Sequence, residues 1–142
     1  MTTPAKILIV DDDLDLVAML QLVLERGGYT VTTANDAAHG LRKVESERPD
    51  LIVLDVMMPD GDEGFQMVAK LREESEPYFA AVPIIMLTAI HHRTDLRFYP
   101  GHGVGTQQMA GYLQVQEFLD KPIDPARLVE RVKRELGKAK KK

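Results

Sequence analysis

Polar residues that could bind phosphate or a metal ion stand at the ends of four short apolar runs in this sequence. Asp11 and Asp12 come after KILIV, Asp55 ends LIVLD, Thr88 ends IIMLT, and Lys121 follows EFLD. Carboxylates about 4 Å apart repel by about 4 kcal/mol per pair at an effective dielectric constant near 20, so such a group needs a cation. Oxygen ligands without cysteine or histidine suit Mg²⁺, which keeps several waters and binds through one or two carboxylates plus a phosphate.

The ammonium of Lys121 and the hydroxyl of Thr88 add the groups that stabilise a phosphoryl oxygen. A carboxylate can itself attack phosphorus and form an aspartyl phosphate. Asp55 is the single carboxylate of its apolar run, so it is the predicted nucleophile, and Asp11 and Asp12 are the predicted metal ligands. Taken alone, Asp55 could equally be a residue that only terminates a strand.

These residues need elements that bring them together. Runs of aliphatic and β-branched residues predict strands over 6–10, 29–34, 51–55, 82–87 and 117–120. Helical spacing of apolar residues predicts helices over 14–26, from a cap at Asn35 or Asp36 to before Pro49, over 65–74, over about 106–114 and over 125–136. The segment 75–81, which contains Pro77, is expected to be a loop.

Strands that alternate with helices predict a parallel sheet with helices on both faces. The expected fold class is α/β, a flavodoxin-like doubly wound five-stranded sheet with strand order 2-1-3-4-5. Ligand sites of such sheets lie at the carboxyl ends of the strands, beside the point where the strand order reverses. In this order Asp11, Asp12 and Asp55 meet there.

Composition limits the class of protein. The 142 residues suffice for one domain, and the absence of cysteine excludes disulfides, thiolate metal sites and cysteine nucleophiles. The start carries no evident signal peptide, and no apolar run approaches the about 18 residues that span a membrane. Without the last five residues, KAKKK, 14 basic and 22 acidic residues remain, which argues against nucleic acid as the main partner.

The sequence resembles the receiver domain of two-component response regulators. The resemblance covers residues from about 5 to 137, and four motifs in matching order carry it. They are ILIVDDD at 7–13, LIVLDVMMPDGDEG at 51–64, IIMLTA at 84–89 and FLDKP at 118–122. The expected organisation is a receiver domain over 1–137 and a basic tail over 138–142.

The resemblance implies a metal site and a phosphoacceptor. Asp55 would accept a phosphoryl group from the phosphohistidine of a histidine kinase. Asp12, Asp55 and the main-chain carbonyl of Met57 would bind Mg²⁺ directly, and Asp11 would bind it through water.

It also implies a switch. Thr88 and Lys121 would bind the phosphoryl oxygens, and small Ala89 would leave room for them. Phe118 matches the aromatic residue that turns inward when Thr88 moves. The bond between Lys121 and Pro122 matches a cis peptide of the family.

One segment departs from the family pattern. Thr88 and Lys121 are 33 positions apart, more than the family pattern has, and the excess falls in residues 90–108. We expect a long loop that alters the choice of partner through the 90–118 face. A metal site at His91, His92 and His102 is disfavoured, because no carboxylate spacing supports it.

The leading hypothesis is a free-standing, cytoplasmic phosphorylation switch, monomeric or weakly dimeric, that does not bind DNA directly. Its partners would be a sensor histidine kinase or phosphotransfer protein and a downstream protein. The alternatives are a Mg²⁺-dependent phosphohydrolase with an aspartyl nucleophile, a receiver-like structural domain that is not phosphorylated, and a flavin-binding module. Met57 stands where such hydrolases carry a second aspartate, and the aspartates after the first strand would repel a flavin phosphate.

Overall fold

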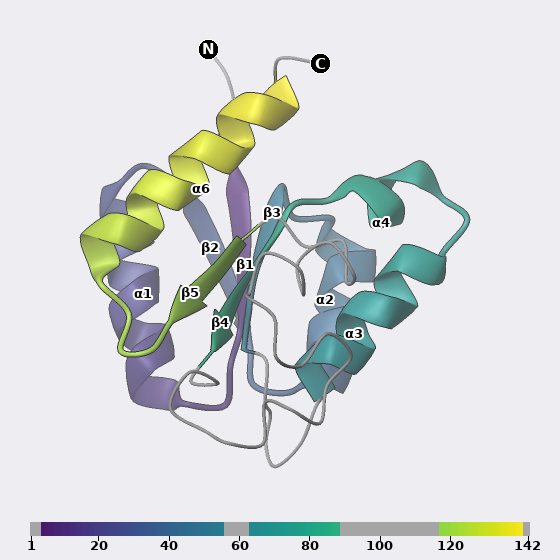
Figure 1. The fold of residues 1–142 in the computed structure, drawn as a ribbon, viewed down its shortest axis with the longest axis horizontal. Coiled ribbons are helices and arrows are strands. Elements are labelled where there is room, and N and C mark those ends of the chain that lie inside the picture. Colours follow the sequence, from purple (N-terminus) through teal and green to yellow (C-terminus); the bar gives the residue numbers. More distant parts are fainter. Residues whose placement is uncertain (1–3, 56–62, 89–116, 141–142) are drawn as a thin grey trace, which may run out of the picture.

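The computed structural model describes residues 4–55, 63–88 and 117–140. Its centre is a five-stranded, fully parallel sheet with the order β2-β1-β3-β4-β5 (Figure 1). The predicted fold class and strand order are therefore confirmed. The strands are β1 (Lys6–Val10), β2 (Thr30–Ala34), β3 (Leu51–Asp55), β4 (Ile84–Thr88) and β5 (Glu117–Asp120).

Helices cover both faces of this sheet. In Figure 1, α1 and α6 lie on one side, and α2, α3 and α4 lie on the other. No helix within the described ranges is long and apolar enough to cross a membrane. The helices are α1 (Leu14–Arg26), α2 (Ala37–Glu47), α3 (Glu63–Glu73), α4 (Pro77–Ala81) and α6 (Pro125–Lys140).

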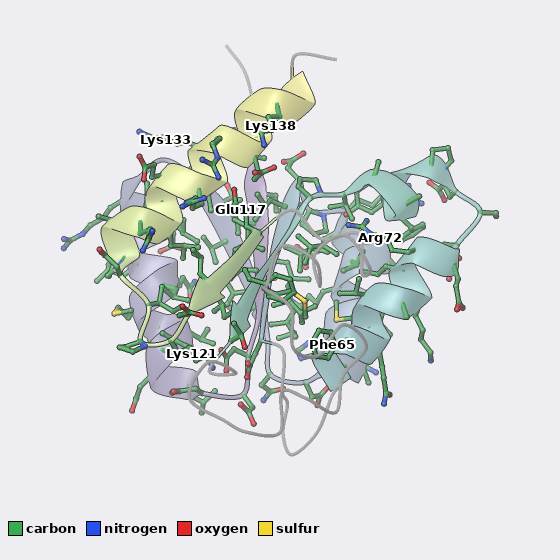
Figure 2. The ribbon with its side chains drawn as sticks, in the orientation of Figure 1. Phe65, Arg72, Glu117, Lys121, Lys133 and Lys138 are labelled. Carbon is green, nitrogen blue, oxygen red and sulfur yellow. The ribbon has the colours of Figure 1, made fainter. Side chains whose placement is uncertain are left out.

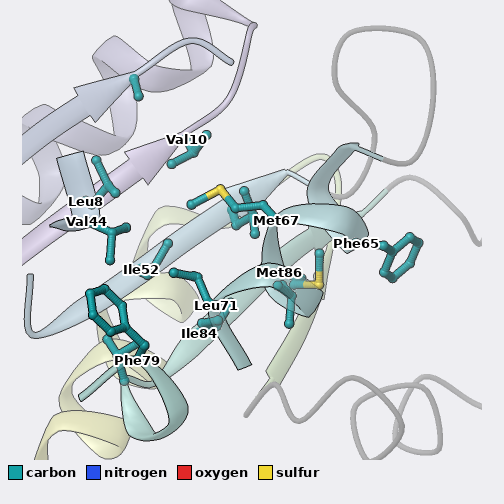
Figure 3. Close-up of a cluster of buried hydrophobic side chains, with 14 residues drawn as sticks. Leu8, Val10, Val44, Ile52, Phe65, Met67, Leu71, Phe79, Ile84 and Met86 are labelled. Atoms are coloured by element: carbon teal, nitrogen blue, oxygen red, sulfur yellow. The ribbon is translucent and has the colours of Figure 1, made fainter. Parts of the chain in front are cut away.

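Successive residues of the central strands point to opposite faces, so each strand contributes to two separate apolar clusters. Leu8 and Ile52 belong to the cluster beneath α2, α3 and α4, which Figure 3 shows. Ile9 and Val53 belong to the cluster shared with α1 and α6. Burial on both faces explains why β1, β3 and β4 read as continuous aliphatic runs.

Aspartate side chains cap the amino ends of three helices, α1, α2 and α6. The carboxylate of Asp13 accepts a hydrogen bond from the main-chain N–H of Leu16 (3.1 Å), and that of Asp36 accepts one from His39 (2.8 Å). Asp124 accepts from the N–H of Ala126 (3.0 Å) at the start of α6. Each carboxylate satisfies an N–H that the first turn leaves unpaired. Of the two predicted caps for α2, Asp36 is the one observed.

The predicted loop 75–81 contains a helix instead, and that prediction was wrong. Pro77 lies in the first turn of α4, where its missing N–H costs nothing. The hydroxyl of Tyr78 donates to the carbonyl of Pro49 (2.7 Å), and Phe79 is buried. The guanidinium of Arg72 donates to the carbonyls of Phe79 and Val82, both at 3.0 Å. Tertiary contacts therefore stabilise a helix too short for periodicity to reveal.

Several boundaries also differ from the prediction, since the second strand begins at Thr30 rather than Tyr29 and the third helix spans Glu63–Glu73 rather than 65–74. The fourth strand begins at Ile84 rather than Val82 and includes Thr88. The last helix continues to Lys140 instead of ending near Leu136, so it includes part of the predicted basic tail. The predicted loop 90–108 and helix 106–114 lie outside the described residues.

Candidate functional site

Asp11 is fixed in a buried position just beyond β1. Its main-chain N–H donates to the carbonyl of Ala34 at the end of β2 (3.1 Å). Its side chain is fully buried, and its Oδ1 accepts a hydrogen bond from the N–H of Asp13 (2.9 Å). The Oδ2 atom has no well-aligned hydrogen-bond donor among the described residues, and the ammonium of Lys121 lies 3.2 Å from it. That oxygen therefore faces the site with capacity to interact with a cation.

Three carboxylates meet at this end of the sheet. Asp11, exposed Asp12 and buried Asp55 each offer an oxygen, and these oxygens all lie within 4.8 Å of one another. Asp55 is the last residue of β3, which pairs with β1 on one side and β4 on the other. A set of closely spaced carboxylate oxygens, one of them buried without a well-aligned hydrogen bond, fits a hard cation such as Mg²⁺.

Lys121 supplies positive charge to the same place. Its Nζ lies 3.2 Å from Oδ2 of Asp11 and 3.4 Å from Oδ1 of Asp55, and its side chain is only 24% exposed. Burial alone would lower the pKa of Lys121, but attraction to Asp55 and Asp11 outweighs it, and the net pKa is raised. The lysine therefore stays an ammonium that partly neutralises the carboxylates.

Main-chain contacts place Lys121 beside the end of β4. Its N–H donates to the carbonyl of Thr88 (2.8 Å), and the peptide bond between Lys121 and Pro122 is cis, as the family resemblance implies. Figure 2 shows Lys121 at the carboxyl end of β5. Thr88 is buried at the end of β4, the strand between those that carry Asp55 and Lys121.

The remaining predicted residues divide into two groups. Phe118 is partly buried on β5 and packs against the cluster beneath α2, α3 and α4. The predicted metal ligand Met57 lies outside the described residues, as do Ala89, His91, His92 and His102. Five of the predicted residues thus gather at one end of the sheet: Asp11, Asp12, Asp55, Thr88 and Lys121.

Residues 7–133 match the family model of the response regulator receiver domain. The chain belongs to this family. Its receiver domain is 39% identical over 128 residues to the alkaline phosphatase synthesis transcriptional regulatory protein PhoP of Bacillus subtilis. It is 35% identical over 135 residues to the DNA-binding response regulator MtrA of Mycobacterium tuberculosis. These matches cover 90% and 95% of this chain but 47% and 52% of the relatives.

Solved structures agree with the receiver fold. A response regulator from Chloroflexus aurantiacus superposes with a TM-score of 0.76 at 33% identity, covering 95% of this chain and 99% of that one. The chemotaxis response regulator CheY4 of Vibrio cholerae gives 0.74 at 32% identity, covering 93% and 98%. The fold of the chain is therefore the one that its membership of the receiver family predicts.

Membership establishes a signalling domain under phosphorylation control, which is a switch and not a classical enzyme. Receiver domains generally bind Mg²⁺ at an acidic pocket and interact with histidine kinases or phosphotransfer proteins. The chain spans about half the length of the first curated relatives, and some of these are DNA-binding regulators. The expectation that this protein does not bind DNA therefore has no support from its relatives.

Proposed function

We propose that Asp55 accepts a phosphoryl group from a sensor histidine kinase or phosphotransfer protein in a Mg²⁺-dependent reaction. The resulting aspartyl phosphate would change the binding of a downstream protein through the 90–118 face. The observation that carries the proposal is the position of Lys121, whose Nζ lies within 3.4 Å of carboxylate oxygens of both Asp11 and Asp55. The protein's own chemistry would be limited to self-phosphorylation and self-dephosphorylation.

The proposed transfer exchanges one bond to phosphorus for another. A carboxylate oxygen of Asp55 attacks the phosphorus of a phosphohistidine, an O–P bond forms, and the P–N bond breaks. The histidine imidazole leaves with the electron pair of that bond. The ammonium of Lys121 and the hydroxyl of Thr88 stabilise the charge on the phosphoryl oxygens.

Asp12, Asp55 and the main-chain carbonyl of Met57 would hold the metal directly, and Asp11 would hold it through water. When bound, Mg²⁺ supplies the positive charge that lets an anionic phosphoryl donor approach three carboxylates. The hydrogen bond from the N–H of Asp13 occupies Oδ1 of Asp11, and Oδ2 faces the ammonium of Lys121 inside the site. This supports a role for Asp11 at the edge of the metal site.

Thr88 and Phe118 would transmit the change. Thr88 is buried at the end of β4, and its register partner on β5 is Asp120, two residues beyond Phe118. Movement of Thr88 toward a phosphoryl oxygen would leave space into which the ring of Phe118 turns. The altered surface would then select the partner.

Intact-mass measurement after incubation with Mg²⁺ and acetyl phosphate tests the proposal. We expect one added phosphoryl group on the wild type and none on Asp55→Asn. Asp13→Asn is the matched control, because it removes a charge from the same acidic segment and asparagine also caps helices well. An adduct on Asp55→Asn equal to that of the wild type would exclude Asp55 as the acceptor. Absence of both an adduct and released phosphate from the wild type would contradict the proposed chemistry.

A further inference from the structure

A groove of about 600 Å³ lies between α2, α3 and α4, on the opposite face of the sheet from α6. Three apolar side chains form its floor: Leu41 of α2, Leu71 of α3 and Phe79 of α4. Leu71 and Phe79 are buried, and Leu41 is partly buried against the same apolar cluster. The floor is therefore part of the packed core, which holds it in place.

The rim of this groove is acidic. Glu45 of α2 and Glu73 and Glu74 at the end of α3 line it, together with one cation, Lys70. All four side chains are exposed. In the part of the chain that the structure describes, none of the three glutamates forms an ion pair. Three glutamates against one lysine leave the rim with a charge of −2, and we call this feature the acidic groove.

These glutamates stand at helix ends that favour the opposite charge. The carboxyl end of a helix carries a partial negative charge and is stabilised by cations. The last turn of α2 contains Glu45 and no basic residue. The last turn of α3 contains Arg72, but its guanidinium already donates to the carbonyls of Phe79 and Val82. A cation bound in the acidic groove would therefore offset a local excess of negative charge.

Arg48 shows how a basic side chain binds beside this groove. Its guanidinium lies 5.2 Å from the ring centroid of Phe79 and 5.3 Å from that of Tyr78, and it pairs with Glu76. Aromatic rings attract a cation to their faces, and a carboxylate fixes its charged end. Phe79 also belongs to the floor of the acidic groove. A second basic side chain fits there, with its aliphatic stem on the floor and its charge at the glutamates.

The chain itself contains a segment with such side chains. Residues 133–142, which we call the lysine-rich segment, hold five lysines and one arginine against a single acidic residue, Glu135. That glutamate is buried and already pairs with Lys138 at 3.3 Å. Figure 1 shows the end of α6 and α4 at the same end of the molecule, where the strands begin, but on opposite faces of the sheet. The end of α6 therefore meets an acidic groove in a second copy.

We propose that the lysine-rich segment of one copy of this chain docks in the acidic groove of a second copy. A two-fold axis between the copies gives each dimer two such contacts, because each chain supplies one segment and one groove. Exposed ion pairs contribute little individually and are screened by salt, so the dimer is weak and dissociates as the ionic strength rises. Neither surface includes a carboxylate of the strand-end site, so the association does not require phosphorylation.

Sedimentation equilibrium of the whole chain at low and high sodium chloride tests the proposal. Glu73→Lys in the groove and Lys140→Glu in the segment should each raise the dimer dissociation constant about tenfold at low salt, because each replaces attraction by repulsion at both contacts. Lys140 is chosen because Lys138 already pairs with Glu135. Glu25→Lys is the matched control, since it reverses an exposed glutamate in the last turn of α1, outside the groove, and should leave the constant unchanged.

An equimolar mixture of Glu73→Lys and Lys140→Glu provides the sharper test. In the mixed dimer one contact joins the two reversed surfaces and the other joins two native surfaces, so the mixture should associate about as tightly as the wild type. A mixture no tighter than either variant alone would overturn the proposal, as would an equal loss in Glu25→Lys. A wild type that stays monomeric up to about 1 mM at low salt would also overturn it, and would leave the groove to a basic segment of another protein.

Discussion

Asp11 and Asp12 are neighbours in the sequence, but their surroundings are opposite. Asp11 is fully buried and is fixed by hydrogen bonds at its main-chain N–H and at Oδ1, whereas Asp12 is exposed. An exposed carboxylate can approach a hydrated ion at little cost in desolvation, while a fixed, buried one contributes charge from a set position. The difference supports distinct roles for the two residues in the proposed metal site.

The ammonium of Lys121 balances part of the negative charge of the metal-free site, so its removal should destabilise the protein. In Lys121→Met the carboxylates of Asp11 and Asp55 lose their cation, and we expect a loss of about 2 kcal/mol in the free energy of unfolding. Because the pKa of Lys121 is raised, the contribution is present below the ordinary lysine pKa and is lost only as pH rises through the folded value. Urea unfolding at neutral pH with chelator measures it.

Lys43→Met is the comparison for that experiment. Lys43 pairs with Glu47 at 3.4 Å on the half-exposed surface of α2, and we expect a loss below about 1 kcal/mol. Equal losses in the free energy of unfolding would mean that Lys121 stabilises the protein no more than a surface lysine does. The carboxylates of Asp11 and Asp55 would then not need its charge for the protein to be stable.

At the level of single residues, the sequence predicted which side chains gather at the sheet edge but not how they are buried. Whether a residue stands at the end of a strand follows from the local sequence pattern, so the motifs predicted the positions of the site residues. Glu135 of α6 is buried, with only 3% of its surface exposed. That burial depends on how α6 packs, and apolar spacing alone did not reveal it. A signal was present, since Glu135 follows Leu128 by seven positions and so lies on the same helical face.

The helix α2 packs closely against β1 at Gly40, where the missing Cβ atom leaves room for the neighbouring side chains. A Cβ atom added at Gly40 would lie 3.0 and 3.1 Å from the methyl groups of Val10 and 3.2 Å from Cε of Met67. For Gly40→Ala we expect a net loss of about 1–2 kcal/mol, because the overpacking exceeds the gain of about 1 kcal/mol in helix propensity. Thermal or urea unfolding would measure the change.

Gly137→Ala is the matched substitution on α6. Apart from its chain neighbours and its own helix backbone, no atom of the described residues lies within 4 Å of the added Cβ, so only the helix propensity changes, and a gain of about 0.5–1 kcal/mol is expected. Stabilisation by both substitutions would show that α2 can move away from β1 without cost.

At the level of elements, strand type and order followed from the sequence because three strands are buried on both faces and leave continuous aliphatic runs. The helix α4 did not, because its five residues are held by contacts with distant residues. Those contacts include the hydroxyl of Tyr78 on Pro49 and the guanidinium of Arg48 over the rings of Tyr78 and Phe79. No local pattern in 75–81 encodes partners 29 positions away.

The whole molecule places its charges unevenly about one sheet. The carboxylates at the carboxyl ends of the strands repel one another in the free protein. The charged side chains between β5 and α6 instead pair with opposite charges, as Glu117 does with Arg131 and Arg134 and as Glu135 does with Lys138. Binding of a cation at the acidic end should therefore act on the stability of the entire fold, because a ligand bound only by the native state shifts the unfolding equilibrium.

Addition of Mg²⁺ should raise the free energy of unfolding of the whole domain, by about 2.7 kcal/mol when free Mg²⁺ is a hundred times its dissociation constant. Chelator should reverse the gain. Asp12→Asn should lose most of it, because an exposed ligand is removed without disturbing the buried Asp11, whereas Asp13→Asn should retain it. Sodium chloride at matched ionic strength separates specific binding from screening. Equal stabilisation of the wild type and Asp12→Asn would mean that the ion acts elsewhere, and the strand-end carboxylates would then need only Lys121 to balance their charge.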